Sequence, residues 1–369
     1  MAAGIAPASV ALQPEALAAD RSDEPRALAL VCVETRRETA DVLTLVFAAA
    51  DRSAIPHAPG QAVTLAVPVA GEILHRTFTI SGASRARDRI AVTVKAHPHG
   101  RATPWLHAHA APGLALAARG PHGSFTLARR EGADRAVAFV SAGSGATPMI
   151  AMLRALAEDA PETRALWVHV ARTPDDVLFG AEVARLQETM PRLEARVVVT
   201  SPRPGWFGFA GRISRRLLSV VAPDLARRDV FACGPEGFMQ ALRLIHAAEG
   251  GDPARLHTER FGPASAPSEE ASRETAREAG PDASPAFTVR LGAKVFSTAP
   301  GETLMQAAAR QAVVIPCGCG QGLCGTCRVR LEEGTVAMRH KGGLSAREEA
   351  EGYVLACSAR ATSDLHLSF

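Results

Sequence analysis

Five of the seven cysteines of this 369-residue chain are crowded between positions 317 and 357. Such uneven crowding in a long chain indicates a metal site rather than a disulfide framework. Three of the five are spaced C-x4-C-x2-C and another follows at a distance, which is the pattern of a plant-type 2Fe–2S centre. The predicted metal ligands are Cys319, Cys324, Cys327 and Cys357.

Glycines are interspersed with these ligands at Gly320, Gly322 and Gly325. Because glycine has no Cβ, it lets backbone N–H groups approach the inorganic sulfides, which tunes the cluster. The alternative is a structural zinc site. Zinc ribbons use two short C-x2-C knuckles, whereas this chain has one loop and a distant partner, so the pattern favours iron–sulfur. Cys317 is expected to be a small buried residue rather than a ligand.

The length predicts two or three domains. Apolar residues make up 47% and charged residues 21%, as in ordinary globular proteins. The net charge of +3 is too small to indicate nucleic acid as a partner. No stretch approaches about 18 uninterrupted apolar residues, so no membrane span is predicted. The N-terminus lacks the basic region of a secretory signal, and we expect a cytoplasmic protein.

Changes in residue pattern divide the chain into five parts. Residues 1–24 are rich in Ala and Pro and are expected to be disordered. Short alternating runs over 25–130 predict an antiparallel β-barrel. Buried strands alternate with helices over 131–261, which predicts a doubly wound α/β sheet. Residues 262–286 contain no apolar residue larger than Ala and form a predicted flexible linker, and strands resume in 287–369 with the cysteine cluster.

Two strand–loop–helix segments of the second domain are candidate nucleotide sites. In AVAFVSAGSGATPMIAML, Gly143 and Gly145 would let a pyrophosphate approach the backbone at a helix N-terminus. In DVFACGPEGFM, Cys233, Gly234 and Pro235 follow a strand at the edge where doubly wound sheets bind their ligands. The alternatives are a plain strand-to-helix turn and, for Cys233, a buried core thiol.

The segment HRTFTISGAS of the first domain has the residue types that a flavin needs. An arginine can clamp a phosphate, an aromatic ring can stack on a flavin, and a hydroxyl can reach the ring nitrogens. On its own the segment favours an ordinary strand. The candidates are Arg76, Thr77, Phe78, Thr79 and Ser81.

Taken in this order, the segments resemble the ferredoxin–NADP reductase superfamily. HRTFTIS is similar to its R-x-[YF]-[ST]-x-[ST] flavin motif, AGSGATP to its G-x-G-x-[TS]-P nucleotide motif, and CGPEGFM to its C-G-P-x-x-M segment. The resemblance runs from about residue 28 to the C-terminus. It implies a multidomain protein with a β-barrel flavin domain, a doubly wound nucleotide domain and an α+β (β-grasp) ferredoxin domain.

The resemblance also implies roles for individual residues. Arg76 would bind the flavin pyrophosphate, Phe78 would stack on the isoalloxazine, and Thr79 would hydrogen-bond near flavin N5. The stretch HGRATPWLHAHAAPG resembles the FAD-binding region of the family, in which Thr103 and the N–H groups of a helix start would meet the pyrophosphate. This favours FAD over FMN.

For the nucleotide, the resemblance implies that Gly143, Gly145 and Thr147 hold it and that Cys233 lies near nicotinamide C4. Thr79 and Cys233 are thus the catalytic candidates. In the segment ARTPDDVLF, Arg172 suits a 2′-phosphate, but two aspartates beside it disfavour further negative charge, so NADH is expected rather than NADPH. Phe261 is expected to cover the flavin face.

The domain order resembles the reductase components of two-component Rieske oxygenases. The stretch MRHKGGLSAREEAEGYVLACSAR resembles reductases that serve N-demethylases of betaine-like substrates. The expected function is therefore electron transfer from NADH through FAD and a 2Fe–2S cluster to an oxygenase component. Alternative acceptors are a diiron hydroxylase, a ring-hydroxylating dioxygenase or a hybrid-cluster protein. A redox-sensing binding protein is a further alternative, although the chain shows no helix-turn-helix and no basic stripe.

Overall fold

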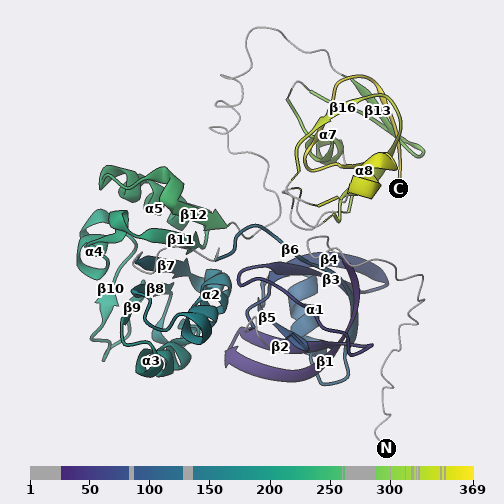
Figure 1. Ribbon diagram of the computed structural model, residues 1–369. Coiled ribbons are helices and arrows are strands. Elements are labelled where there is room, and N and C mark those ends of the chain that lie inside the picture. Colours follow the sequence, from purple (N-terminus) through teal and green to yellow (C-terminus); the bar gives the residue numbers. More distant parts are fainter. Residues whose placement is uncertain are drawn as a thin grey trace, which may run out of the picture.

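The computed structural model describes most of the three expected domains (Figure 1). The predicted segments 1–24 and 262–286 lie outside the described residues, as do Cys317, Cys319 and Cys324. The described residues are 26–82, 87–127, 136–259, 261, 287–299, 301–311, 313–316, 320, 322, 325–340, 343–344 and 346–369.

The first domain is a curled antiparallel sheet with strand order β4-β3-β6-β1-β2-β5. A bridge between Ile80 and Val92 links the two edges. Alternate residues of each strand point inward, as the period of a strand requires, so Leu28, Leu30 and Cys32 are all buried. The predicted antiparallel barrel is confirmed. Its elements are β1 (Arg26–Thr39), β2 (Val42–Ala49), β3 (Ala62–Val69), β4 (Glu72–Thr79), β5 (Arg89–Lys95), α1 (Ala102–His109) and β6 (Ala115–His122).

The second domain is a parallel sheet with strand order β10-β9-β8-β7-β11-β12 and helices on both faces. Phe139 packs with one layer of helices and Val140 with the other, because successive residues of a strand face opposite ways. The predicted doubly wound sheet is confirmed. Its elements are β7 (Val137–Ala142), α2 (Ala146–Asp159), β8 (Ala165–Ala171), α3 (Gly180–Thr189), β9 (Leu193–Val199), β10 (Phe209–Ala210), α4 (Arg215–Val221), β11 (Asp229–Cys233), α5 (Glu236–Ala248) and β12 (Leu256–Glu259).

The third domain is a mixed sheet of order β14-β13-β19-β15-β17 with a small ladder of β16 and β18. Leu304, Ala307 and Ala308 of α7 are buried against the sheet in one core. This is the expected α+β arrangement. Its elements are β13 (Thr288–Leu291), β14 (Lys294–Ser297), α7 (Leu304–Arg310), β15 (Arg328–Glu333), β16 (Val336–Met338), α8 (Ala346–Ala350), β17 (Tyr353–Leu355), β18 (Ala359–Ala361) and β19 (Leu365–Ser368).

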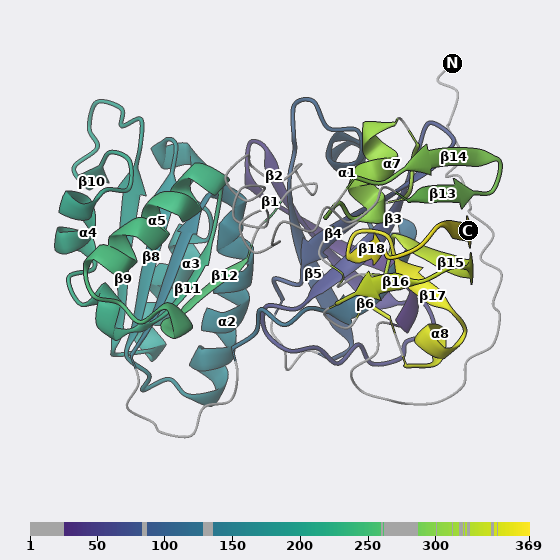
Figure 2. The same cartoon turned by 90° about the horizontal axis from the view of Figure 1, so that it is seen from above.

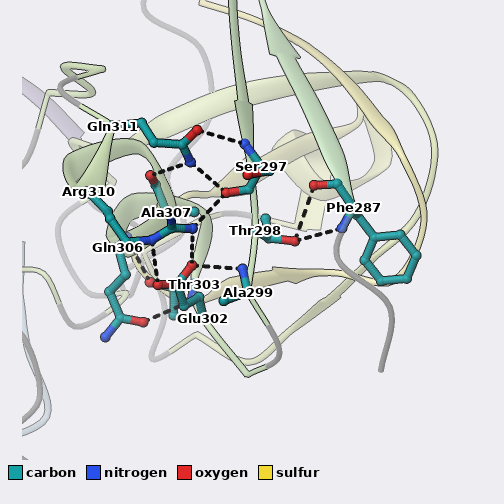
Figure 3. A network of polar contacts seen from close by, with 10 residues as sticks. All are labelled: Phe287, Ser297, Thr298, Ala299, Glu302, Thr303, Gln306, Ala307, Arg310 and Gln311. Atoms are coloured by element: carbon teal, nitrogen blue, oxygen red, sulfur yellow. Dashed lines mark hydrogen bonds and ion pairs between the residues drawn. The ribbon is translucent and has the colours of Figure 1, made fainter. Parts of the chain in front are cut away.

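The start of α7 is capped by its own residues, and its end is bonded to the end of β14 (Figure 3). Thr303 and Gln306 form a capping box that satisfies N–H groups at the helix start. At the helix end, Arg310 and Gln311 both donate to the carbonyl oxygen of Ser297, at 3.0 and 2.7 Å. These bonds orient the helix on the sheet that also carries the cysteine loop.

The nucleotide domain and the ferredoxin domain contact different sides of the barrel (Figures 1 and 2). The ferredoxin domain lies next to β6 in both views, and an ion pair joins Arg119 of β6 to Glu348 of α8. Among the described helices, none has both the length and the apolar composition of a bilayer-crossing segment.

Candidate functional site

The flavin segment forms the edge strand β4 of the barrel. Arg76 pairs with Leu65 and Phe78 with Val63, so both lie on the face that carries those two residues. The Arg76 side chain is exposed and donates to the carbonyl oxygen of His75 at 2.7 Å, while Phe78 is half-buried against the barrel core. An exposed guanidinium and an aromatic ring therefore lie two residues apart on one face, as a bound phosphate and ring system require.

The three hydroxyl groups of this segment differ in their partners. Thr77 Oγ1 is 2.8 Å from Thr64 Oγ1, and Ser81 Oγ is 2.9 Å from Thr93 Oγ1. Thr79 is buried, and its Oγ1 has no hydrogen-bond partner in the described part of the chain. A buried hydroxyl without a partner costs free energy unless a ligand supplies one. The orphaned Thr79 hydroxyl therefore fits the flavin contact that was expected of it.

The expected pyrophosphate-binding helix is α1, which begins directly after Arg101. No side chain caps its first turn, so its leading N–H groups are not satisfied by a cap. Thr103 Oγ1 accepts a hydrogen bond from the N–H of His97 at 3.0 Å, and Arg101 pairs with Glu72 at 2.8 Å. The helix start is thus held beside β4, and the Thr103 hydroxyl also fixes the preceding turn.

The nucleotide segments meet where the strand order of the second sheet reverses, between β7 and β11. A Cβ on Gly145 would lie 2.2 Å from the carbonyl oxygen of Cys233, so only glycine lets the two loops pack this closely. Gly143 has φ 54°, and the space beside it where a Cβ would stand is open. Thr147 donates to the Ser144 carbonyl at 3.0 Å and stabilises the turn. This arrangement fits a pyrophosphate at the switch point of a doubly wound sheet.

Cys233 is fully buried at the end of β11 and is paired in register with Glu259 of β12. Burial, and secondly the Glu259 carboxylate, raise the pKa of the Cys233 thiol well above its usual value. Burial also raises the pKa of Glu259 to about 8. Both groups are therefore neutral at about pH 7. Gly234 and Pro235 follow directly, and Pro235 precedes α5.

Glu259 was missed by the sequence reasoning. Its Oε2 is buried and has no hydrogen-bond partner among the described residues. The segment LHTERFG contains both Glu259 and Phe261, but only Phe261 was predicted from it to lie in the site. Phe261 is 42% exposed at the end of the same segment. A half-buried glutamate whose Oε2 is buried beside Cys233 is a functional-site candidate because its pKa is strongly perturbed.

The region expected to contact the adenosine ribose contains paired charges. Arg172 is 3.7 Å from Asp176, whose carboxylate also accepts from the N–H and the hydroxyl of Thr173. Asp175 pairs with Arg203. Because each arginine already has a carboxylate partner, the region offers little uncompensated positive charge for a 2′-phosphate.

Two of the predicted cluster ligands, Cys327 and Cys357, are described. The N–H of Gly322 donates to Cys357 Sγ at 3.1 Å, and the N–H of Ala356 donates to the Cys327 carbonyl at 3.0 Å. An N–H donated to a cysteine sulfur fits a thiolate ligand of an iron–sulfur cluster. The described residues contain no set of three or more metal-binding side chains, since Cys319 and Cys324 lie outside them.

Arg154 of α2 joins the nucleotide domain to the barrel. Its guanidinium binds both carboxylate oxygens of Glu182 at 2.7 Å and also donates to the carbonyl of Ser81. The Ser81 hydroxyl is hydrogen-bonded to the Thr93 hydroxyl, which is in turn hydrogen-bonded to the Thr44 hydroxyl. A cleft of about 630 Å³ lies beside this joint, and its lining includes Arg36, Glu38, Arg154, Phe179, Glu182 and Arg185.

Three family models match the chain in succession. They describe an oxidoreductase FAD-binding domain over residues 30–127, an oxidoreductase NAD-binding domain over 139–244 and a 2Fe-2S iron-sulfur cluster binding domain over 289–362. The cofactors are therefore FAD, a nicotinamide nucleotide and a 2Fe–2S cluster.

Curated relatives match over almost the whole chain. The stachydrine N-demethylase reductase subunit of Rhizobium meliloti is 34% identical, over 90% of this chain and 93% of the relative. The glycine betaine monooxygenase reductase subunit of Pseudomonas aeruginosa is also 34% identical, over 92% and 94%. Among solved structures, phthalate dioxygenase reductase shares the fold with a TM-score of 0.57 at 22% identity, over 93% of this chain and 98% of that one. The chain thus belongs to the family of monooxygenase and demethylase reductase subunits, oxidoreductases with FAD-binding, NAD-binding and 2Fe–2S domains.

Proposed function

We propose that this reductase delivers electrons from NADH to the oxygenase component of a two-component Rieske system that demethylates a betaine-like quaternary ammonium compound. The observation that carries the proposal is the order of three cofactor domains in one chain, with the third domain joined to the flavin barrel by the ion pair of Arg119 and Glu348. The relatives that match over 93% and 94% of their own length are a stachydrine N-demethylase reductase subunit and a glycine betaine monooxygenase reductase subunit.

When bound, FAD divides the two electrons of a hydride into single-electron steps, and the cluster accepts one electron at a time. In our proposal Arg76 holds the FAD pyrophosphate, Phe78 stacks on the ring system, and Thr79 donates its hydroxyl proton near flavin N5. Thr77 and Ser81 support the strand through their bonds to Thr64 and Thr93. Thr103 and the uncapped start of α1 would meet the pyrophosphate, which supports FAD over FMN.

For the nucleotide, we propose that Gly143, Gly145 and Thr147 shape the pyrophosphate loop and that Cys233, Gly234 and Pro235 border the nicotinamide. Neutral Cys233 and Glu259 add no fixed charge at the ends of β11 and β12. Hydride transfer itself needs no general acid or base, so the site does not need a triad or an ionised carboxylate pair. Phe261, beyond β12, remains the proposed cover of the flavin face.

We also propose NADH as the donor. The pairing of Arg172 with Asp176 and of Arg203 with Asp175 supports it, since a 2′-phosphate would have to compete with carboxylates already present. Comparison of kcat/KM for NADH and NADPH tests this proposal. A preference for NADPH would overturn it.

We also propose domain boundaries at residues 25–130, 131–261 and 287–369, a linker over 262–286, and a cytoplasmic location. The last is supported by thiol ligands that need a reducing compartment. Limited proteolysis tests the boundaries, and cell fractionation tests the location.

The decisive experiment is anaerobic titration of the purified protein with NADH, followed by an aerobic assay with excess NADH, a betaine demethylase oxygenase component, its quaternary ammonium substrate and O2. We expect NADH to bleach both the flavin and the iron–sulfur absorbance, and the mixture to release formaldehyde from glycine betaine or stachydrine. Cys357→Ser should lose transfer to the oxygenase but keep flavin reduction. Bleaching without formaldehyde release, together with rapid reduction of a diiron, dioxygenase or hybrid-cluster acceptor, would instead assign one of those acceptors.

A further inference from the structure

Three charged side chains join the ferredoxin domain to the barrel. Nη2 of Arg119, in β6, lies 3.1 and 3.4 Å from the two carboxylate oxygens of Glu348, in α8. The same carboxylate accepts a hydrogen bond from Arg328 at the start of β15. We call this set the Arg119–Glu348–Arg328 trio. One carboxylate thus bridges a guanidinium of each domain.

The trio lies directly against the cysteine loop. Arg328 follows the predicted ligand Cys327 in sequence, and its N–H donates to the Gly325 carbonyl at 3.2 Å. A Cβ on Gly325 would be 3.2 Å from Nε of Arg119, so the guanidinium packs on the loop itself. That Nε is buried and has no hydrogen-bond partner in the described part of the chain. Arg119 therefore contacts the segment that holds the cluster rather than a remote surface.

On the barrel side, the trio is close to the flavin strand. Arg119 is paired in register with Thr64 of β3, and the Thr64 hydroxyl lies 2.8 Å from that of Thr77 in β4. Paired residues share a face of the sheet, so Arg119, Thr64 and Thr77 form a row across three neighbouring strands. A short path of contacts therefore connects the strand proposed to hold the flavin with the cysteine loop.

We propose that the Arg119–Glu348–Arg328 trio is a docking latch, which holds the cluster loop at the flavin barrel during internal electron transfer and opens to release the ferredoxin domain to its acceptor. This inference rests on the proposed function. With both cofactors bound, the two electrons that FAD receives as one hydride would cross the docked contact one at a time, and the second would stay on the flavin until the acceptor had reoxidised the cluster. The side chains of Arg119, Glu348 and Arg328 are 29%, 14% and 36% exposed, so water and salt reach the latch and weaken it.

A single substitution in the barrel can remove the contact between the two domains without removing an ion pair within the ferredoxin domain. In Arg119→Ala, Glu348 keeps Arg328 as its partner, so no carboxylate is left buried and unpaired within the ferredoxin domain. The matched control is Arg89→Ala, which removes an exposed barrel arginine whose ion pair with Asp88 stays within the barrel. A second pair of variants is Glu348→Gln with Glu351→Gln as its control, because Glu351 forms an ion pair with Arg347, four residues earlier in the same domain.

Stopped-flow mixing of the holoenzyme with NADH measures flavin reduction and cluster reduction separately, and reduction of cytochrome c reports transfer through the cluster. For Arg119→Ala and Glu348→Gln we expect unchanged flavin reduction and cluster content, with cluster reduction slower by roughly fivefold, the effect of one partly exposed ion pair. Raising salt from about 20 to about 500 mM should slow cluster reduction in the wild type and in both controls but not in Arg119→Ala.

A wild-type rate of cluster reduction in Arg119→Ala, with the same salt dependence as the wild type, would overturn the latch. Equal slowing in Arg89→Ala would also overturn it, since any loss of surface charge would then suffice. If instead the wild type reduced its flavin but never its cluster, the proposed function would fail. The two failures are therefore distinguishable in one set of traces.

Discussion

Cys233 and Glu259 are paired in register on the neighbouring parallel strands β11 and β12, at the sheet edge proposed to receive the nicotinamide. Neither position carries a charge at about pH 7, because burial raises the pKa of both groups. The ends of β11 and β12 therefore carry no charge from these two side chains although both are ionisable.

Glu259→Gln is expected to stabilise the protein at alkaline pH. The folded-state pKa of Glu259 is raised from 4.5 to about 8, so folding opposes its ionisation, and stability falls as pH rises through that window. The glutamine variant lacks this loss, and its melting temperature should exceed that of the wild type increasingly from pH 4.5 to about 8. Thermal unfolding across this range measures the effect, with exposed Glu188→Gln as control. Parallel curves for Glu259→Gln and the wild type would contradict it.

Buried His169 should make the nucleotide domain acid-sensitive. The N–H of Leu178 donates to Nε2, so Nδ1 carries the proton and donates to the Ser141 hydroxyl at 3.0 Å. Burial lowers the pKa of His169 from 6.5 to about 4. Its contribution to stability is therefore full above 6.5 and is lost as pH falls toward 4. His169→Gln should be less stable at neutral pH yet lose less stability over that window, and urea unfolding of both proteins tests this.

Thr79→Val separates the effect of the Thr79 hydroxyl on flavin reduction from its effect on the stability of the fold. Valine keeps the shape of threonine and removes a buried hydroxyl that has no partner among the described residues, so the apoprotein should be at least as stable as the wild type. With FAD bound, reduction by NADH should slow by roughly tenfold, the value of one hydrogen bond of about 1.4 kcal/mol to the reacting ring. Thr79→Ser retains the hydroxyl and should retain most of the rate. Equal loss in both variants would indicate a packing effect instead.

Arg154→Ala tests the joint between barrel and nucleotide domain. The change removes the paired bonds to Glu182 and the bond to the Ser81 carbonyl, which together orient the two domains. Because a small misplacement of reacting groups is costly, flavin reduction by NADH should fall by roughly tenfold at unchanged FAD content. Exposed Arg185→Ala lines the same cleft and serves as control. Loss of FAD from Arg154→Ala would point to a role in cofactor retention instead.

Features that depend on residues close together in the chain were predictable from sequence. The C-x4-C-x2-C spacing, the Gly143–Gly145 turn and the alternation that buries Leu28, Leu30 and Cys32 each reflect local geometry, which the order of residue types determines directly. These patterns were sufficient for the fold class and the cofactors.

The contacts that only the tertiary structure determines join residues that are far apart in the chain. The register of β11 with β12 brings Glu259 beside Cys233, the packing of α2 on the barrel brings Arg154 to Ser81, and the docking of the third domain brings Glu348 to Arg119, 229 residues away. No local pattern encodes these partners. Ion pairs between distant residues, and the burial that shifts a pKa, arise when separate segments of the chain pack together and exclude water from a common site.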